Sequence, residues 1–184
     1  FSELIEIDIS SLKNKLAHLK PLFTDGWNYR YNYEGFLTYS PMSNSSICRS
    51  YLQVYRNGIF ESVETSMLSY GNMIPSLGFE NEIVKAIRQY LNVIKGIEIN
   101  PPLIVSLILN GVSGFKLGVD QYSIDEHLIN ENTLKLPLVS LNEIDITTVS
   151  IFSTLQSMFD VLWQSAGFER CFDYDENGNW IKSN

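Results

Sequence analysis

The chain has 184 residues, 45% of them hydrophobic, with a net charge of −8 and a sequence pI near 4.7. Ten tyrosines, ten phenylalanines and three tryptophans supply enough apolar surface to offset the entropy of ordering, which excludes a disordered chain. The 13 lysines and arginines are scattered, so we expect no direct contact with nucleic acid and no binding to an anionic membrane.

Length and cysteine content limit how the chain is organised. The length predicts one domain over residues 1–184, and because the sequence begins at Phe1 within an amphipathic pattern, we expect a fragment of a longer chain. Cys48 and Cys171 fit no CxxC spacing, so they indicate neither a structural zinc motif nor a disulfide framework, and reduced thiols predict a cytoplasmic protein. No apolar run approaches the roughly 20 residues that a membrane-spanning helix needs.

The first predicted element is a short helix over residues 9–20. Its apolar stripe has i, i+4, i+7 spacing and consists of Leu12, Leu16 and Leu19. Pro21 ends the helix, and Asp25-Gly26 predicts a turn into an extended segment.

That extended segment places an aromatic residue at every second position, namely Trp27, Tyr29, Tyr31 and Tyr33. The period of two predicts a strand with one aromatic face, which either stacks a ligand or packs on a core. Burial is the simpler interpretation, because Arg30 is the only cation in the segment and large aromatics gain most by leaving water. If the domain binds a ligand, the candidate residues are Trp27, Tyr29, Arg30, Tyr31, Tyr51 and Tyr55.

Residues 51–64 carry the strongest local signal, a β-hairpin. Asn57-Gly58 tolerates the positive φ angles of a type I′ turn, and the flanks are rich in β-branched and aromatic residues. With those two residues as the turn, Leu52 pairs with Val63 and Val54 pairs with Glu61. This register predicts one face with Leu52, Val54, Ile59 and Val63 and another with Tyr51, Tyr55 and Phe60.

The second half of the chain predicts two long helices and several strands. Helical spacing runs over residues 79–95 and 147–166, each followed by a glycine. The apolar run 103–109 predicts a central strand covered on both faces, with 115–119 as its antiparallel partner, and 134–141 a strand broken at Pro137. The fold class is therefore α+β: a mostly antiparallel sheet built from hairpins with two long helices packed on it.

The segment from Asp173 to Gly178 has two interpretations. Asp173, Asp175 and Asn177 match the start of a calcium loop, D-x-D-x-[DN]-G, in which alternate oxygens converge on the ion. The match fails at the twelfth position, which is Asn184. The alternative, which we prefer, is a hairpin turn that lets Tyr174 pair back with Trp180.

Signals for catalysis are weak throughout the sequence. Glu80 and Glu82 are expected on a solvated helix face, and His18 has no sequence neighbour that would orient it. His127 stands beside two acidic residues, as a metal-binding or acid-base group could, but an exposed histidine in an acidic loop is the commoner case. No GxSxG, HExxH, P-loop or GxGxxG pattern is present. We therefore predict no catalytic residues and no cofactor.

Four segments together resemble a known bacterial arrangement: YLQVYRNGIFESVE, IPSLGFENEIVKAIRQYL, PPLIVSLILNGVSGFKLGV and FDYDENGNW. In order and wording they are similar to the region that follows the AlbA-type (Schlafen-like, or divergent AAA) DNA-binding domain. The resemblance covers residues 25–180 and implies a bacterial cytosolic protein whose nucleic-acid contact lies in a preceding domain. It supplies no catalytic residues.

The leading functional hypothesis is a non-catalytic accessory domain of a bacterial DNA-binding, regulatory or defence protein, which senses a small ligand or mediates oligomerisation. A metal-dependent enzyme of nucleotide or nucleic-acid metabolism is the first alternative. A module that docks a protein partner through an edge strand or an aromatic surface is the second.

Overall fold

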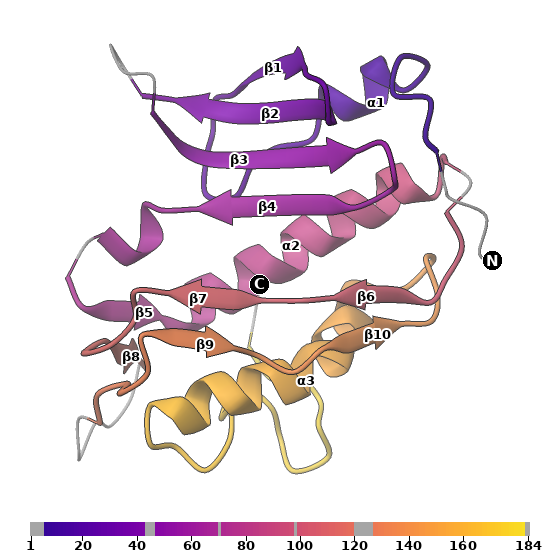
Figure 1. Ribbon diagram of the computed structural model, residues 1–184. Coiled ribbons are helices and arrows are strands. Elements are labelled where there is room, and N and C mark those ends of the chain that lie inside the picture. The colour runs from indigo at the N-terminus through magenta and orange to yellow at the C-terminus, as the bar shows by residue number, and fades with distance from the viewer. Residues whose placement is uncertain (1–5, 43–46, 70, 98, 120–126, 183–184) are drawn as a thin grey trace. The chain divides into compact units, whose positions relative to one another are not determined.

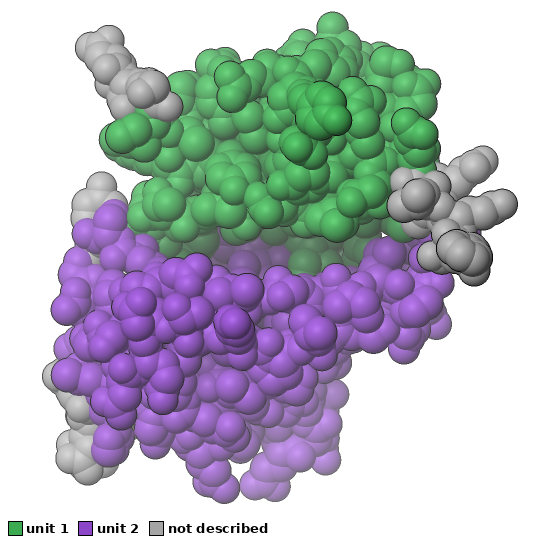
Figure 2. Space-filling model, in the orientation of Figure 1, with its two compact units in different colours: residues 1–67, 86–99 green, residues 68–85, 100–184 purple. Residues whose placement is uncertain are grey.

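The computed structural model describes residues 6–42, 47–69, 71–97, 99–119 and 127–182 (Figure 1). In these ranges the chain is a mixed α+β protein whose largest sheet is antiparallel and built from hairpins, accompanied by two long helices, as predicted. Its contacts group the residues into two compact units (Figure 2). Unit 1 comprises 1–67 and 86–99, and unit 2 comprises 68–85 and 100–184.

Unit 1 contains one four-stranded antiparallel sheet in the order β1-β2-β3-β4. The strands are β1 (Asn28–Tyr31), β2 (Gly35–Pro41), β3 (Cys48–Tyr55) and β4 (Phe60–Glu64). One face of this sheet, which we call the packed face, carries the buried side chains of Phe36, Thr38, Leu52 and Val54. Phe60 on the same face lies 5.9 Å, ring centroid to ring centroid, from Tyr90 of helix α2 (Ser76–Ile94).

Helix α1 is shorter than its pattern predicted. It covers only Lys13–Leu16, and turns occupy residues 9–12. The predicted apolar stripe is nevertheless confirmed, since Leu12, Leu16 and Leu19 are all buried. Burial of the stripe therefore does not require a full-length helix.

The predicted hairpin is confirmed, but its register is wrong by one residue. Val54 pairs with Phe60 and Leu52 with Ser62, because the loop holds three residues, Arg56 to Gly58, with Gly58 at a φ of 85°. A three-residue loop with glycine in the left-handed region is the next most common hairpin connection after the two-residue turn. A one-residue slip moves every β4 side chain to the other face, so Phe60 joins the packed face and Glu61 leaves it.

Unit 2 has three two-stranded sheets and the second long helix. Its strands are β5 (Met73–Pro75), β6 (Leu103–Val105), β7 (Ile108–Asn110), β8 (Lys116–Gly118), β9 (Thr133–Lys135) and β10 (Val139–Leu141), and its helix is α3 (Thr148–Ser165). β10 pairs with β6 and β7 with β9, both antiparallel, whereas β5 pairs with β8 in parallel. A short 3₁₀ helix, η1 (Met67–Ser69), precedes β5.

The prediction of a single covered strand over 103–109 is wrong. The run forms two short strands, β6 and β7, and leaves Ile104 63% and Ile108 50% exposed. Residues 115–119 do not return beside the run, because β8 pairs with β5 instead. An apolar run indicates burial on average but does not identify the strand that pairs with it. The predicted break at Pro137 does separate β9 from β10.

Helix α3 follows its predicted bounds closely. Thr147 caps the N-terminus by accepting a hydrogen bond from the Ser150 N–H at 3.1 Å. The buried face consists of Ile151, Phe152, Leu155, Met158, Phe159, Leu162 and Trp163. In the described part of the chain, neither this helix nor any other combines the length and apolar character needed to span a bilayer.

Candidate functional site

The face of the unit 1 sheet opposite the packed face gathers aromatic and charged side chains from all four strands. The pairings Arg30–Leu37, Leu37–Gln53 and Gln53–Glu61 form one cross-strand row, and Tyr39–Tyr51 belongs to the next. Tyr55 stands two residues after Gln53 and so shares this side. We call the surface formed by Arg30, Tyr39, Tyr51, Tyr55 and Glu61 the tyrosine face.

The tyrosine face is concave. A depression of about 600 Å³ lies on it, and its lining consists of Arg30, Leu37, Tyr39, Pro41, Ile47, Cys48, Tyr51, Gln53, Tyr55 and Glu61. The volume falls within the range of roughly 300–1,000 Å³ that is usual for small-molecule sites. All of its lining residues belong to unit 1, so the depression is a property of that unit alone.

Two interactions hold the polar groups of the depression in place. The Arg30 guanidinium lies 5.6 Å from the centroid of the Tyr39 ring, a cation–π contact. The Tyr51 hydroxyl donates a 2.7 Å hydrogen bond to the Glu61 carboxylate. Burial, together with that hydrogen bond, raises the pKa of Tyr51 to about 12, and burial and Glu61 also raise the pKa of Tyr55. Both phenols are therefore protonated donors at neutral pH.

The predicted ligand-binding residues divide between the two faces. Arg30, Tyr51 and Tyr55 line the depression. Tyr29 and Tyr31 lie on the side of the packed face, where both rings contact buried Phe36 at centroid distances of 5.4 and 5.2 Å. They nevertheless remain 44% and 47% exposed, so the expectation that they are buried is wrong: β1 is an edge strand, and all four of its residues are exposed.

The remaining residues of the alternating stretch lie outside the depression. The Trp27 indole donates a 2.9 Å hydrogen bond to the Ala17 carbonyl, which ties the start of the strand to the segment after α1. Tyr33 is 92% exposed next to the turn between β1 and β2. The stretch therefore supplies one lining residue, Arg30, which the alternation places on the opposite side from the aromatics.

Tyr39 and Glu61 line the depression but are not among the ligand-binding residues that the sequence predicted. Tyr39 lies on β2, beyond the alternating stretch, and its cross-strand partner Tyr51 lies on β3. Glu61 was assigned to the face of Val54 by the incorrect register, although it stands opposite Gln53. A three-residue loop is also compatible with Asn57-Gly58, and the register that it gives would have placed Glu61 on the tyrosine face.

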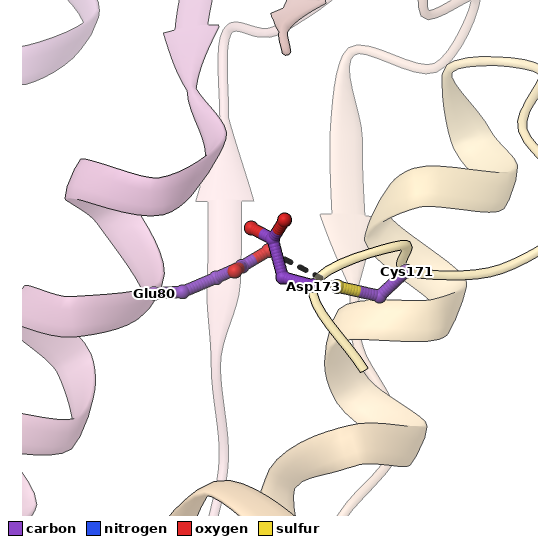
Figure 3. Close-up of side chains that lie close together, drawn as sticks. All are labelled: Glu80, Cys171 and Asp173. Carbon is purple, nitrogen blue, oxygen red and sulfur yellow. Dashed lines mark hydrogen bonds between the residues drawn. The ribbon is translucent and has the colours of Figure 1, made fainter. Parts of the chain in front are cut away.

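Unit 2 contains a second polar cluster, formed by Glu80, Cys171 and Asp173 (Figure 3). Glu80 projects from α2, and the other two residues lie in the loop that follows α3. One donor atom from each of the three residues lies within 4.8 Å of the other two, and all three side chains are buried. No other group of three such side chains meets this criterion among the described residues.

The cluster is partly satisfied by its neighbours. The Trp163 indole N–H donates to Glu80 Oε1 at 2.8 Å, and the Cys171 thiol donates to the same oxygen at 3.6 Å (Figure 3). Lys182 Nζ lies 3.3 Å from Asp173 Oδ1. Glu80 Oε2 is buried without a hydrogen-bond partner. Burial raises the pKa of Glu80 to about 8 despite the Trp163 bond, with Asp173 adding to the rise, and burial also raises the pKa of the Cys171 thiol.

The predicted calcium-loop residues are engaged in different interactions. The Asp173 side chain belongs to the buried cluster, whereas Asp175 Oδ1 accepts the backbone N–H groups of Asn177 and Asn179 at 2.8 Å each. The Asn179 side-chain amide also donates to this carboxylate, and together with these backbone bonds it lowers the pKa of Asp175. The turn brings Tyr174 and Trp180 together in an antiparallel bridge, which confirms the predicted hairpin contact.

The expectation that Glu80 is solvated is wrong, because its side chain is fully buried. It precedes Ile83, Val84, Ile87 and Leu91 at i+3, i+4, i+7 and i+11, all of them buried. The position of Glu80 on the apolar face of the helix was therefore the feature of the sequence that indicated its burial. Cys171 and Cys48 are free thiols.

Comparison with known proteins identifies no relative: no family model, no curated protein and no solved structure matches the chain.

Proposed function

We propose that this chain is a non-catalytic accessory module that binds a small ligand on the tyrosine face of unit 1. The observation that supports the proposal is the 600 Å³ depression, where three tyrosines, Arg30 and Glu61 converge from four strands. Concave surfaces with aromatic walls and a few placed polar groups are the usual form of a small-molecule site.

The side chains define the kind of ligand that fits. Tyrosine rings offer flat apolar surfaces for stacking, Arg30 offers a cation and N–H donors, and Glu61 offers acceptor oxygens. We propose a planar ligand of small size with both donors and acceptors on its edge. A polyanion is disfavoured, because the chain carries a net charge of −8.

The arrangement favours binding over turnover. Neither His18 nor His127 lines the depression, and the Tyr51 phenol donates its hydrogen bond to the Glu61 carboxylate. A general base within reach of a nucleophile is the arrangement that hydrolytic chemistry needs.

The first experiment screens planar heterocycles, nucleosides and aromatic amino acids by thermal shift, and then measures the affinity of any compound that raises the melting temperature. We expect the double variant Tyr51→Ala/Tyr55→Ala to lose the shift while its far-UV circular dichroism is unchanged. Loss of both rings removes stacking worth on the order of 1–3 kcal/mol each.

The matched control is the double variant Tyr29→Ala/Tyr31→Ala on the packed face. It removes two tyrosines from the same sheet but leaves the depression intact, so we expect ligand binding to persist. Its melting temperature should fall, because each lost contact with Phe36 is worth about 1 kcal/mol. Loss of binding in this control with retention in the first variant would refute the proposed site.

Protein docking is the second candidate function, and one observation favours it. β1 is an edge strand whose four residues are all exposed, so its free backbone groups can add a strand from a partner. Under this alternative, the chain associates in a concentration-dependent manner in light scattering.

The wider context remains a proposal that rests on the resemblance described above. We propose a bacterial, cytoplasmic protein in which this chain follows a DNA-binding domain and reports ligand binding to it. The two free thiols fit a reducing compartment. The reading frame of the gene tests this context directly.

A further inference from the structure

The buried cluster of Glu80, Cys171 and Asp173 in unit 2 has the composition of a metal site. It offers one sulfur and carboxylate oxygens, a set that suits zinc and cobalt better than magnesium or calcium because thiolate is a soft ligand. The sequence predicted Asp173 as a metal ligand, but it did not connect this residue with Glu80 and Cys171, which lie 91 residues apart.

One spacing between ligand atoms of the cluster fits a tetrahedral ion. Zinc–sulfur and zinc–oxygen bonds of about 2.3 and 2.0 Å at a tetrahedral angle place the two ligand atoms about 3.5 Å apart. The Cys171 sulfur lies 3.6 Å from Glu80 Oε1. The Trp163 N–H donates to the same carboxylate oxygen and so orients the Glu80 side chain, as hydrogen-bond donors commonly do for metal ligands.

An unsatisfied atom points to a missing partner in the same place. Glu80 is fully buried, its carboxyl group points toward Asp173 and Cys171 (Figure 3), and its Oε2 accepts no hydrogen bond. Buried polar atoms without partners are rare and costly. A cation bound within the cluster would satisfy this oxygen.

The charges balance when a divalent ion is present. Thiolate Cys171 with carboxylates Glu80 and Asp173 carries three negative charges. A divalent ion together with Lys182, whose Nζ lies 3.3 Å from Asp173, supplies three positive charges. A neutral buried cluster avoids the large penalty of an uncompensated charge.

We propose that Glu80, Cys171 and Asp173 bind a structural zinc-type divalent ion, with a water or a second carboxylate oxygen as the fourth ligand. The site is independent of the tyrosine face, which belongs to unit 1.

Cobalt is the probe that tests the assignment. The untagged 184-residue chain is treated with a chelator, freed of it and titrated with Co²⁺. We expect one ion per chain, a sulfur-to-cobalt charge-transfer band in the near ultraviolet, and intense visible bands of tetrahedral cobalt that Zn²⁺ abolishes. Zn²⁺ should also raise the melting temperature of the chain.

Variants identify the ligands. Cys171→Ser should lose the charge-transfer band, and Glu80→Gln, which keeps the side-chain shape, should weaken Zn²⁺ binding by about 100-fold. Cys48→Ser, the other thiol, should retain the full signal. Asp175→Asn should retain it too, because its carboxylate serves the adjacent turn. Circular dichroism verifies that each variant folds.

Three outcomes would overturn the assignment. The wild-type chain shows no charge-transfer band, or the band disappears in Cys48→Ser and persists in Cys171→Ser, or Ca²⁺ binds in preference to Zn²⁺ and is lost in Asp175→Asn. Absence of the band in the wild-type chain would mean that Glu80 and Asp173 are a pair of carboxyl groups that share a proton. Preferential binding of Ca²⁺ that is lost in Asp175→Asn would support the calcium-loop interpretation of residues 173–178 instead.

Discussion

At the scale of single residues, Glu61 is the one carboxylate among the described residues that line the depression. It accepts the Tyr51 hydroxyl at 2.7 Å and contributes to the raised pKa of both Tyr51 and Tyr55. A ligand that donates a hydrogen bond to Glu61 therefore competes with Tyr51 for the same oxygens. Occupancy of the site should therefore change the Tyr51–Glu61 hydrogen bond.

The substitution Glu61→Gln should lower the pKa of Tyr51 from about 12 toward 10. The fall should be incomplete, because burial is the largest cause of the shift and remains in the variant. The hydrogen bond needs the phenol proton, so its contribution to stability is full below pH 10 and is lost as pH rises through about 12. NMR titration of the tyrosine Cζ carbons measures the change.

The control for this titration is Glu131→Gln, which removes an exposed carboxylate from unit 2. It should leave the pKa of Tyr51 unchanged. An equal pKa in Glu61→Gln and wild type would show that the hydrogen bond does not form in solution.

Residue-level reasoning from the sequence found part of the tyrosine face and missed the buried cluster. Arg30, Tyr51 and Tyr55 were identified because they stand in strands with clear alternation. Glu80 and Cys171 are brought together only by the packing of α2 against the segment after α3. Contacts of that separation leave no periodic signal in the sequence.

At the scale of elements, Gly35 fixes how β2 begins beside β3. Its φ is 150°, and a Cβ at this position would collide with the Val54 carbonyl oxygen. Its backbone N–H donates a hydrogen bond to the Asn32 side-chain oxygen at 2.8 Å. This close approach aligns the rows of the tyrosine face.

Gly35→Ala should therefore destabilise the chain by about 3 kcal/mol, through overpacking against the Val54 backbone. Urea denaturation measures the loss. Gly26→Ala is the matched control, because a Cβ there meets nothing within 4 Å, and its free energy of unfolding should stay within about 0.5 kcal/mol of wild type. Equal stability of both variants would contradict the tight approach of β2 and β3.

The sequence predicted elements better than it predicted their pairing. The two long helices have strong 3.6-residue periodicity and were placed within a few residues of their bounds. The partner of β8 was wrong, because β5 has only three residues and lies 43 positions earlier along the chain. The register of β4 was wrong because Asn57-Gly58 is compatible with two loop lengths.

At the scale of the whole molecule, the two units carry different features. Unit 1 has the concave tyrosine face, and unit 2 has the buried cluster. The net charge of −8 disfavours polyanions as ligands of either unit. Neutral and cationic planar compounds are therefore the appropriate probes for the chain as a whole.

A crystallographic fragment screen samples every accessible face of the molecule with such probes and tests the central claim most directly. We predict that bound fragments concentrate in the depression, with rings stacked on Tyr39, Tyr51 or Tyr55 and polar edges toward Arg30 and Glu61. A screen in which fragments bind elsewhere, while the accessible tyrosine face stays unoccupied, would contradict the account.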